Sequence, residues 1–310
     1  MCGQFAERSG IISSTDVATP ARIRALLLIL LSVWCIRIRV RGQDSLDSLR
    51  QRAEKGNAQA QTTLGTMYRN GEGVSQDLPE AAKWFRKAAE QGNSEAEDSL
   101  GFLYDYGGGV PIDHAEAAKW YRKAAEQGNA DAALNLGWIY DSGQGFALDH
   151  AEAVRWYRKA AELGNDDAAF NLGVIYETGQ GVAQNYDEAA KWYRKAAEQR
   201  MHIAQLSLGR LYATGRGVAR DQAEAARWYQ KAADLGLATA QFELSLAYSR
   251  GEGVAKDPVV AYEWMDLAVF RALGAAKEKY SAARDALGRG ITADQMAEAK
   301  RRVEEWKWKK

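Results

Sequence analysis

Apolar residues recur along most of this chain at helical spacing. In residues 57–92 a first apolar stripe is spaced at i, i+4, i+7 and i+8, which predicts one face of an α-helix. It consists of Ala60, Leu64, Met67 and Tyr68. A second stripe follows, made of Ala81, Trp84, Phe85, Ala88 and Ala89. The pattern therefore predicts a helical hairpin whose two helices have roughly 13 and 14 residues.

The segment between the two stripes carries turn and capping signals. Gly71 and Gly73 are expected to end the first helix, because glycine tolerates the positive φ of a C-cap. Asp77 then begins the second helix as N-cap, and Glu80 completes a capping box. The same pair recurs at Asp113/Glu116, Asp149/Glu152 and Asp221/Glu224, with Asn185/Glu188 as a variant.

The hairpin repeats six times with a period of 36 residues. The period is clearest in the tryptophans at positions 84, 120, 156, 192, 228 and 264. Leucine keeps the same period from Leu64 to Leu244, and tyrosine from Tyr68 to Tyr248. A period of this length is typical of a solenoid, in which each unit packs only on its neighbours. We therefore predict an all-α solenoid with six repeats over residues 57–274.

The repeated pattern resembles the Sel-1-like repeat family, which is related to tetratricopeptide repeats. The first unit shows it as Ala60, Leu64-Gly65, Tyr68, Gly71-Glu72-Gly73-Val74, Asp77, Ala81, Trp84, Lys87-Ala88-Ala89 and Gly92. The resemblance implies a right-handed superhelix and an adaptor function, with a partner that differs from case to case. Arg200, in place of the terminal glycine, and Ser245, in place of the glycine after the leucine, depart from the pattern. They mark two junctions where the packing is expected to differ.

The segments outside the repeats have different compositions. Residues 43–56 match the second half of a preceding unit, and residues 275–310 are expected to form two capping helices with a polar outer face. Residues 1–20 have no periodicity and are expected to be disordered. Residues 21–42 contain an apolar run at 25–36, which suits a secretory signal or signal anchor but is too short to span a bilayer. Export or membrane tethering is therefore expected, with a cytoplasmic protein as the alternative.

Composition narrows the classes of function. Lys and Arg number 41, as do Asp and Glu, so no net field favours nucleic acid. Both cysteines lie outside the repeats, which argues against disulfides or thiolate metal sites within them. Basic columns on the second helices, such as Lys83 and Arg86, are interpreted as a solvated face paired with nearby carboxylates. Docking of an acidic or lipid surface there is the alternative.

No catalytic constellation stands out. The chain has no G-x-S-x-G, H-E-x-x-H or P-loop, and its G-x-G pairs join helix to helix, so they are turns. His114 and His150 share one repeat position, at a separation that cannot hold a metal without further ligands. We therefore expect no enzyme activity, cofactor or metal.

Variable positions on the first helices are the candidate binding residues. By analogy with tetratricopeptide solenoids, they line a concave groove. We predict partner contacts at Phe102, Tyr106, Asn135, Trp138, Asn171, Val174 and Arg210. Two alternatives stay open: the asparagines could brace adjacent helices, and Phe102 and Trp138 could pack in the core.

The sequence therefore indicates a monomeric scaffold that binds another protein or an extended peptide. One alternative is a hydrolytic enzyme, as claimed for cysteine-rich relatives, but this chain lacks their cysteine pairs. The other is an envelope-associated structural protein that acts through its N-terminal segment.

Overall fold

A computed structural model of the 310-residue protein describes residues 45–309, with side chains described to residue 306. All regular elements in this range are helices. The first helix, α1, is described over residues 45–54. The others are α2 (Ala58–Asn70), α3 (Leu78–Ala89), α4 (Ser94–Tyr106), α5 (His114–Glu126), α6 (Ala130–Ser142), α7 (His150–Glu162), α8 (Asp166–Thr178), α9 (Tyr186–Glu198), α10 (His202–Thr214), α11 (Gln222–Asp234), α12 (Ala238–Arg250), α13 (Pro258–Arg271), α14 (Gly274–Gly288) and α15 (Ala293–Lys309).

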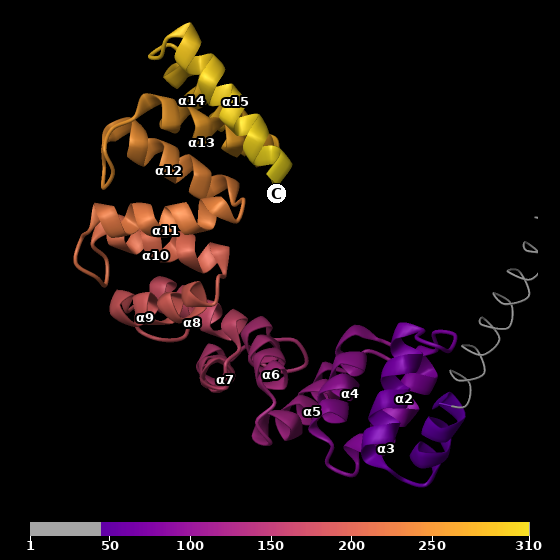
Figure 1. The fold of residues 1–310 in the computed structure, drawn as a ribbon. Helices are drawn as coiled ribbons and strands as arrows, with labels where there is room; N and C mark the ends of the chain where they lie inside the picture. Colours follow the sequence, from indigo (N-terminus) through magenta and orange to yellow (C-terminus); the bar gives the residue numbers. More distant parts are fainter. Residues whose placement is uncertain (1–44, 310) are drawn as a thin grey trace, which may run out of the picture.

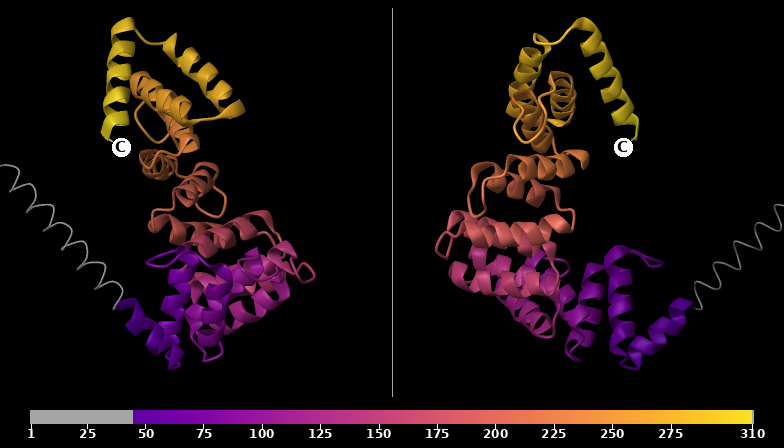
Figure 2. Two further views of the ribbon diagram at one scale, coloured as in Figure 1. Left: turned by 90° about the vertical axis from the view of Figure 1, so that its right-hand side faces the viewer. Right: turned by 60° about the vertical axis from the view of Figure 1, so that its left-hand side comes forward.

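The helices stack in chain order into a curved solenoid (Figure 1). Each repeat contributes a first helix, from α2 to α12 in even numbers, and a second helix, from α3 to α13 in odd numbers. In Figure 1 α4, α6 and α8 lie on the inner side of the arc, and α5, α7 and α9 on its outer side. The two further views in Figure 2 show the two ends of the described chain far apart. The predicted all-α solenoid with a period of about 36 residues is confirmed.

The core combines small residues with large rings. The repeated leucines, such as Leu64 and Leu136, are fully buried, as are alanines of both helices. In the first five repeats the glycine after the leucine lies directly beneath an aromatic ring of the second helix. A Cβ on Gly65 would lie 2.8 Å from ring carbons of Phe85, closer than carbon atoms can pack. The glycine is therefore needed for the two helices of a repeat to approach each other.

The sixth repeat makes the equivalent contact with different residues. Ser245 replaces the glycine, and Met265 replaces the aromatic ring. Both side chains are fully buried, and the Ser245 hydroxyl donates a hydrogen bond of 2.5 Å to the carbonyl of Ala261. The flexible methionine leaves room for the serine, so this departure from the pattern is matched within the same repeat.

The junction at Arg200 keeps the glycine conformation without the glycine. Arg200 has φ 68°, a left-handed conformation like that of the equivalent glycines, such as Gly164 with φ 99°. A left-handed backbone is unfavourable for a residue with a Cβ. The fold is thus preserved at this position with local backbone strain.

Helix capping differs partly from the prediction. The Asp77 side chain accepts from the backbone N–H of Glu80, as expected of an N-cap. The reciprocal half of the box is not formed, because the N–H of Asp77 donates to the carbonyl of Tyr68 and the Glu80 carboxylate binds Lys83. The first helices have caps that the sequence analysis missed, namely the side chains of Asn57, Asn93, Asn129 and Asn165.

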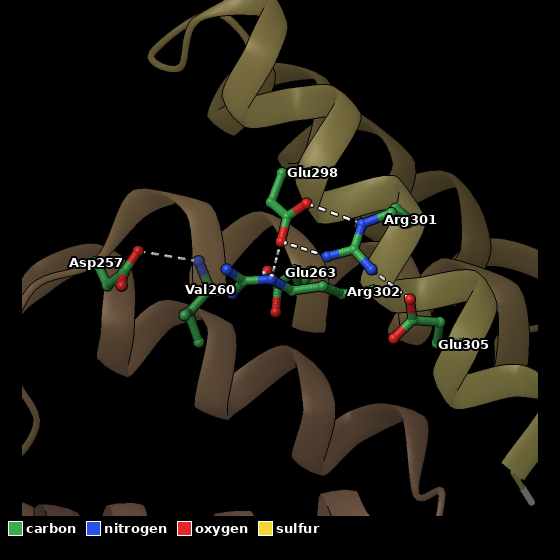
Figure 3. A network of polar contacts seen from close by, with 7 residues as sticks. All are labelled: Asp257, Val260, Glu263, Glu298, Arg301, Arg302 and Glu305. Atoms are coloured by element: carbon green, nitrogen blue, oxygen red, sulfur yellow. Dashed lines mark hydrogen bonds and ion pairs between the residues drawn. The ribbon is translucent and has the colours of Figure 1, made fainter.

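The last two helices, α14 and α15, follow the sixth repeat, and both pack on α13. Ala299 and Val303 of α15 are buried, and Trp306 packs edge-on against Trp264 at 6.5 Å between ring centroids. On the polar side Arg302 bridges Glu263 of α13 at 3.0 Å and Glu298 at 2.8 Å (Figure 3). Hydrogen bonds from Arg301 and Arg302 lower the pKa of Glu298 to about 2. The predictions for residues 1–20 and 21–42 lie outside the described residues, as does the side chain of Trp308.

Candidate partner-binding surface

The predicted binding residues come from four consecutive first helices. Phe102 and Tyr106 lie on α4, and Asn135 and Trp138 on α6. The remaining residues are Asn171 and Val174 on α8 and Arg210 on α10. Because α4, α6 and α8 lie on the inner side of the arc, the six residues on these three helices belong to helices of the expected side (Figure 1).

Three of these residues form what we call the aromatic cluster: Phe102, Tyr106 and Trp138. Their exposed fractions are 43%, 62% and 39%. The rings of Phe102 and Tyr106 pack on each other with centroids 4.5 Å apart. Trp138 occupies on α6 the repeat position that Phe102 occupies on α4, and these two helices are in contact. Large apolar side chains gathered on one exposed surface are typical of an interaction site.

The other four residues are more constrained. The amide of Asn135 donates to Asp98 of the preceding repeat at 3.4 Å, so this asparagine does brace adjacent helices. Val174 is half-buried and packs against the main core cluster, and Asn171 is also half-buried. Arg210 forms an ion pair with Glu243 of the next repeat at 3.1 Å. These residues would contribute to a binding surface chiefly by shaping it.

Carboxylates accompany the aromatic cluster, and the sequence analysis did not single them out. Asp98 lies one helical turn before Phe102 on α4, and Asp131 lies two turns before Trp138 on α6. Burial, together with the nearby carboxylate of Asp131, raises the pKa of Asp98 to about 6. The signal in the sequence is that α4, α6 and α8 contain no lysine or arginine.

Two histidines are held by aspartates of their own repeats. Nδ1 of His114 lies 2.6 Å from Asp105, and Nδ1 of His150 lies 2.7 Å from Asp141. Each pair joins the end of a first helix to the start of the second helix, so it secures the turn between them. The described residues offer no group of three or more side chains able to hold a metal ion.

The two basic columns on the second helices have different partners. Lysines and arginines such as Lys83 and Lys119 pair with the glutamate three residues earlier, as predicted. The second column was wrongly paired with carboxylates: Arg158 and Arg194 instead donate to Tyr176 and Tyr212 of the next repeat, at 2.6 and 2.8 Å. Arg86 and Arg122 make the same bond to Tyr104 and Tyr140. This column therefore holds successive repeats together.

Comparison with known proteins identifies the repeats. The Sel1 repeat model matches residues 58–93, 94–129, 130–165, 166–201, 202–237 and 238–269. The chain belongs to the Sel1 repeat family. Sel1 repeat proteins are generally non-catalytic scaffolds for protein interactions.

Two solved bacterial structures are similar to this Sel1 repeat protein. A protective antigen of uropathogenic Escherichia coli with an SLR fold is 38% identical, with a TM-score of 0.74. The match covers 84% of this chain and 56% of that protein, so this chain spans little more than half of its length. A Sel1 repeat protein from Oxalobacter formigenes is 34% identical, with a TM-score of 0.61, over 73% of this chain and 100% of that one. No curated protein matches significantly.

Among residues 45–309, none of the helices combines the length and the apolar character needed to cross a bilayer.

Proposed function

We propose that this Sel1 repeat protein is a monomeric scaffold that binds an extended segment of a partner protein along α4, α6 and α8, with Arg210 at the edge. The aromatic cluster carries the proposal. Phe102, Tyr106 and Trp138 remain 39–62% exposed in a chain whose repeated tryptophans are mostly buried in the core. Exposed aromatic side chains are the residues most often found as energetic anchors of interfaces.

The repeat geometry suits an extended ligand. Packed helices are about 8–10 Å apart, and an extended chain advances about 3.3 Å per residue. In a segment that crosses from α4 to α6, roughly every third side chain would therefore lie over an equivalent position of the next repeat. Because the helices hold this surface in place before binding, little conformational entropy would be lost on the scaffold's side.

The sequence adds a proposed location. Export, or anchoring through residues 21–42, would place the scaffold outside the cytoplasm. The apolar run at residues 25–36 supports this part of the proposal. Separating the soluble and membrane fractions of cells that carry the tagged full-length chain would test it.

Partner capture with the full-length chain tests the binding surface. The bait would be wild type or the Phe102→Ala, Trp138→Ala double variant, and captured proteins would be quantified by mass spectrometry. Leu148→Ala is the matched control, since Leu148 is a 57% exposed apolar residue on the turn between α6 and α7. We expect a partner retained by the wild type and the control and lost from the double variant. Equal capture by all three baits would show that the aromatic cluster is not the binding site.

A further inference from the structure

Negative charge is concentrated on the inner layer of the solenoid in its central repeats. The inner helices carry nine carboxylates, of which four are in α4, two in α6 and three in α8, and they carry no lysine, arginine or histidine. The intervening outer helices α5, α7 and α9 together carry nine lysines and arginines and seven carboxylates, so their charges nearly balance. Because α4, α6 and α8 carry acidic charges and no basic ones, the inner surface of these repeats is locally electronegative.

Some of these carboxylates have a structural role. Asp105 and Asp141 bind histidines, Glu97 accepts from Gln127, and Glu177 accepts from Tyr193. The remaining ones along the inner surface include Glu95, Asp98, Asp131 and Asp167. Glu95, Asp131 and Asp167 are exposed and occupy the same repeat position on successive helices. They form an acidic row across α4, α6 and α8.

Asp98 is the member of this set with the most crowded environment. It is half-buried beside Asp131 and Glu95, and Arg69 of α2 is the cation that acts on it. Its hydrogen bond comes from the neutral amide of Asn135, and Asp131 likewise accepts from the amide of Asn165 at 2.8 Å. Amide donors satisfy hydrogen-bonding capacity but leave the negative charge in place. A cation brought by a ligand would relieve the mutual repulsion of these carboxylates.

The aromatic cluster is an independent sign of a ligand on the same helices. Asp98, Phe102 and Tyr106 follow one another at four-residue spacing on α4, so the carboxylate and the rings share one stripe. Four residues of helix rise correspond to about 6 Å, roughly two residues of an extended chain. A ligand that contacts both groups must therefore combine a positive charge with a large apolar side chain at short separation.

We propose that the partner segment is cationic, with a lysine or arginine two or three residues from a large apolar side chain, and that it binds with its charge toward Asp98 and Asp131 and its apolar group on the aromatic cluster. This inference rests on the proposed function and specifies its ligand. Charge complementarity of this kind selects partners chiefly by rejecting those of like charge. Acidic peptides and nucleic acids are repelled by the same row of carboxylates.

Display of a random peptide library tests the proposal with a defined probe. The full-length wild-type chain, the Phe102→Ala, Trp138→Ala variant and an Asp98→Asn, Asp131→Asn variant would each be panned, and the recovered peptides sequenced. Expected are peptides enriched in lysine or arginine beside aromatic or aliphatic residues. In a direct binding assay their affinity should fall by about tenfold for the Asn variant, and high salt should weaken binding to the wild type more than to that variant.

The outcomes distinguish a failure of the cationic ligand from a failure of the proposed function. Recovery of apolar peptides with no basic bias, lost only from the Phe102→Ala, Trp138→Ala variant, would overturn the cationic ligand and leave the proposed function intact. Peptides bound equally by all three proteins, or no enrichment at all, would overturn both. Recovery of sequences that match residues 22–41 of this chain would overturn the assignment to a partner, since that segment is itself rich in arginine and apolar residues. Circular dichroism of both variants confirms that they are folded.

Discussion

Arg158 of one repeat donates a hydrogen bond of 2.6 Å to the hydroxyl of Tyr176 in the next repeat. The two residues are 18 positions apart, half of the repeat period, and the same bond recurs from Arg50 to Tyr68 and onward to Arg194 and Tyr212. The series ends where Gln230 takes the arginine position and donates to Asp234 of its own helix. One repeat later the connection returns with donor and acceptor exchanged. Asp266 stands at the arginine position and accepts a hydrogen bond of 3.1 Å from Arg284, which stands at the tyrosine position.

Removal of one hydroxyl from this series should weaken a single junction. Tyr176→Phe leaves the ring in place and removes the acceptor of the Arg158 bond, which should lower the free energy of unfolding by about 1 kcal/mol. Urea denaturation followed by circular dichroism measures the change. Tyr248→Phe is the matched control, because its repeat position is the same but Gln230 stands in place of the arginine. A loss of equal size in both variants would contradict a specific role for the arginine.

The glycine–ring contact predicts a non-additive pair of substitutions. Gly65→Ser places a Cβ 2.8 Å from the Phe85 ring and should destabilise the fold by about 1–3 kcal/mol. The combination with Phe85→Met reproduces the Ser245 and Met265 arrangement of the sixth repeat and should recover most of the loss. A double-mutant cycle of urea unfolding measures the coupling. Additive losses from the two substitutions would show that the sixth repeat owes its packing to other residues.

Arg200 offers a stabilising substitution. Arg200→Gly removes the Cβ from a backbone with φ 68° and should raise the free energy of unfolding by about 1 kcal/mol, net of the greater freedom of glycine in the unfolded chain. The reverse change, Gly164→Arg at φ 99°, should lower it by a similar amount. Thermal and urea unfolding of the two variants tests both signs. A neutral Arg200→Gly would mean that contacts of the arginine side chain offset its backbone strain.

Asp98 should make stability depend on pH. Its folded-state pKa of about 6 lies above the value in an unfolded chain, so the folded protein binds this proton more tightly. Its contribution to stability is therefore present at low pH and is lost as the pH rises through about 6. Asp98→Asn should raise the free energy of unfolding by about 1–2 kcal/mol near pH 8 and change it little near pH 4.

Urea titrations at several pH values provide the measurement for Asp98. The control is Glu126→Gln, which also replaces a carboxyl by an amide but at an exposed position at the end of α5. A wild-type profile that is flat between pH 4 and 8 relative to the Asp98→Asn variant would contradict the prediction. If the cationic ligand is correct, the same substitution that stabilises the fold also weakens binding, as is common for residues kept for function.

The fold of the repeats could be predicted almost completely because each structural role recurs from one unit to the next. Within one repeat, the helix, the turn and the N-cap can each be inferred from local sequence alone. Examples are the apolar stripe of Leu64 and Tyr68, the turn at Gly71 and the N-cap at Asp77. Contacts between repeats could not be derived in this way. Arg86 was paired with a carboxylate of its own helix, because side-chain neighbours within a helix follow from its pitch, whereas its bond to Tyr104 depends on how two hairpins are stacked.

The candidate site was predictable in part. Phe102, Tyr106 and Trp138 were expected to be exposed because variable positions of the first helix alternate with its buried stripe, and their exposure is confirmed. The role of Asn135 could not be decided, since bracing and peptide binding use the same amide. The acidic row was missed because the overall charge is zero, and the lack of lysine and arginine in α4, α6 and α8 has a consequence only once these helices are known to lie on one side of the arc.

Because the Arg–Tyr bond recurs between successive repeats, one repeat can take the place of another in the stack. If residues 166–201 were excised, α10 would follow α7, and Arg158 would meet Tyr212 in place of Tyr176. The new first helix would begin after Asn165, whose side chain caps a helix, rather than after Met201, whose side chain does not. Such a chain would lose one unit of length yet keep every type of contact at the new joint. Proteins with joints of this kind can gain or lose whole units by duplication or deletion in a single genetic event.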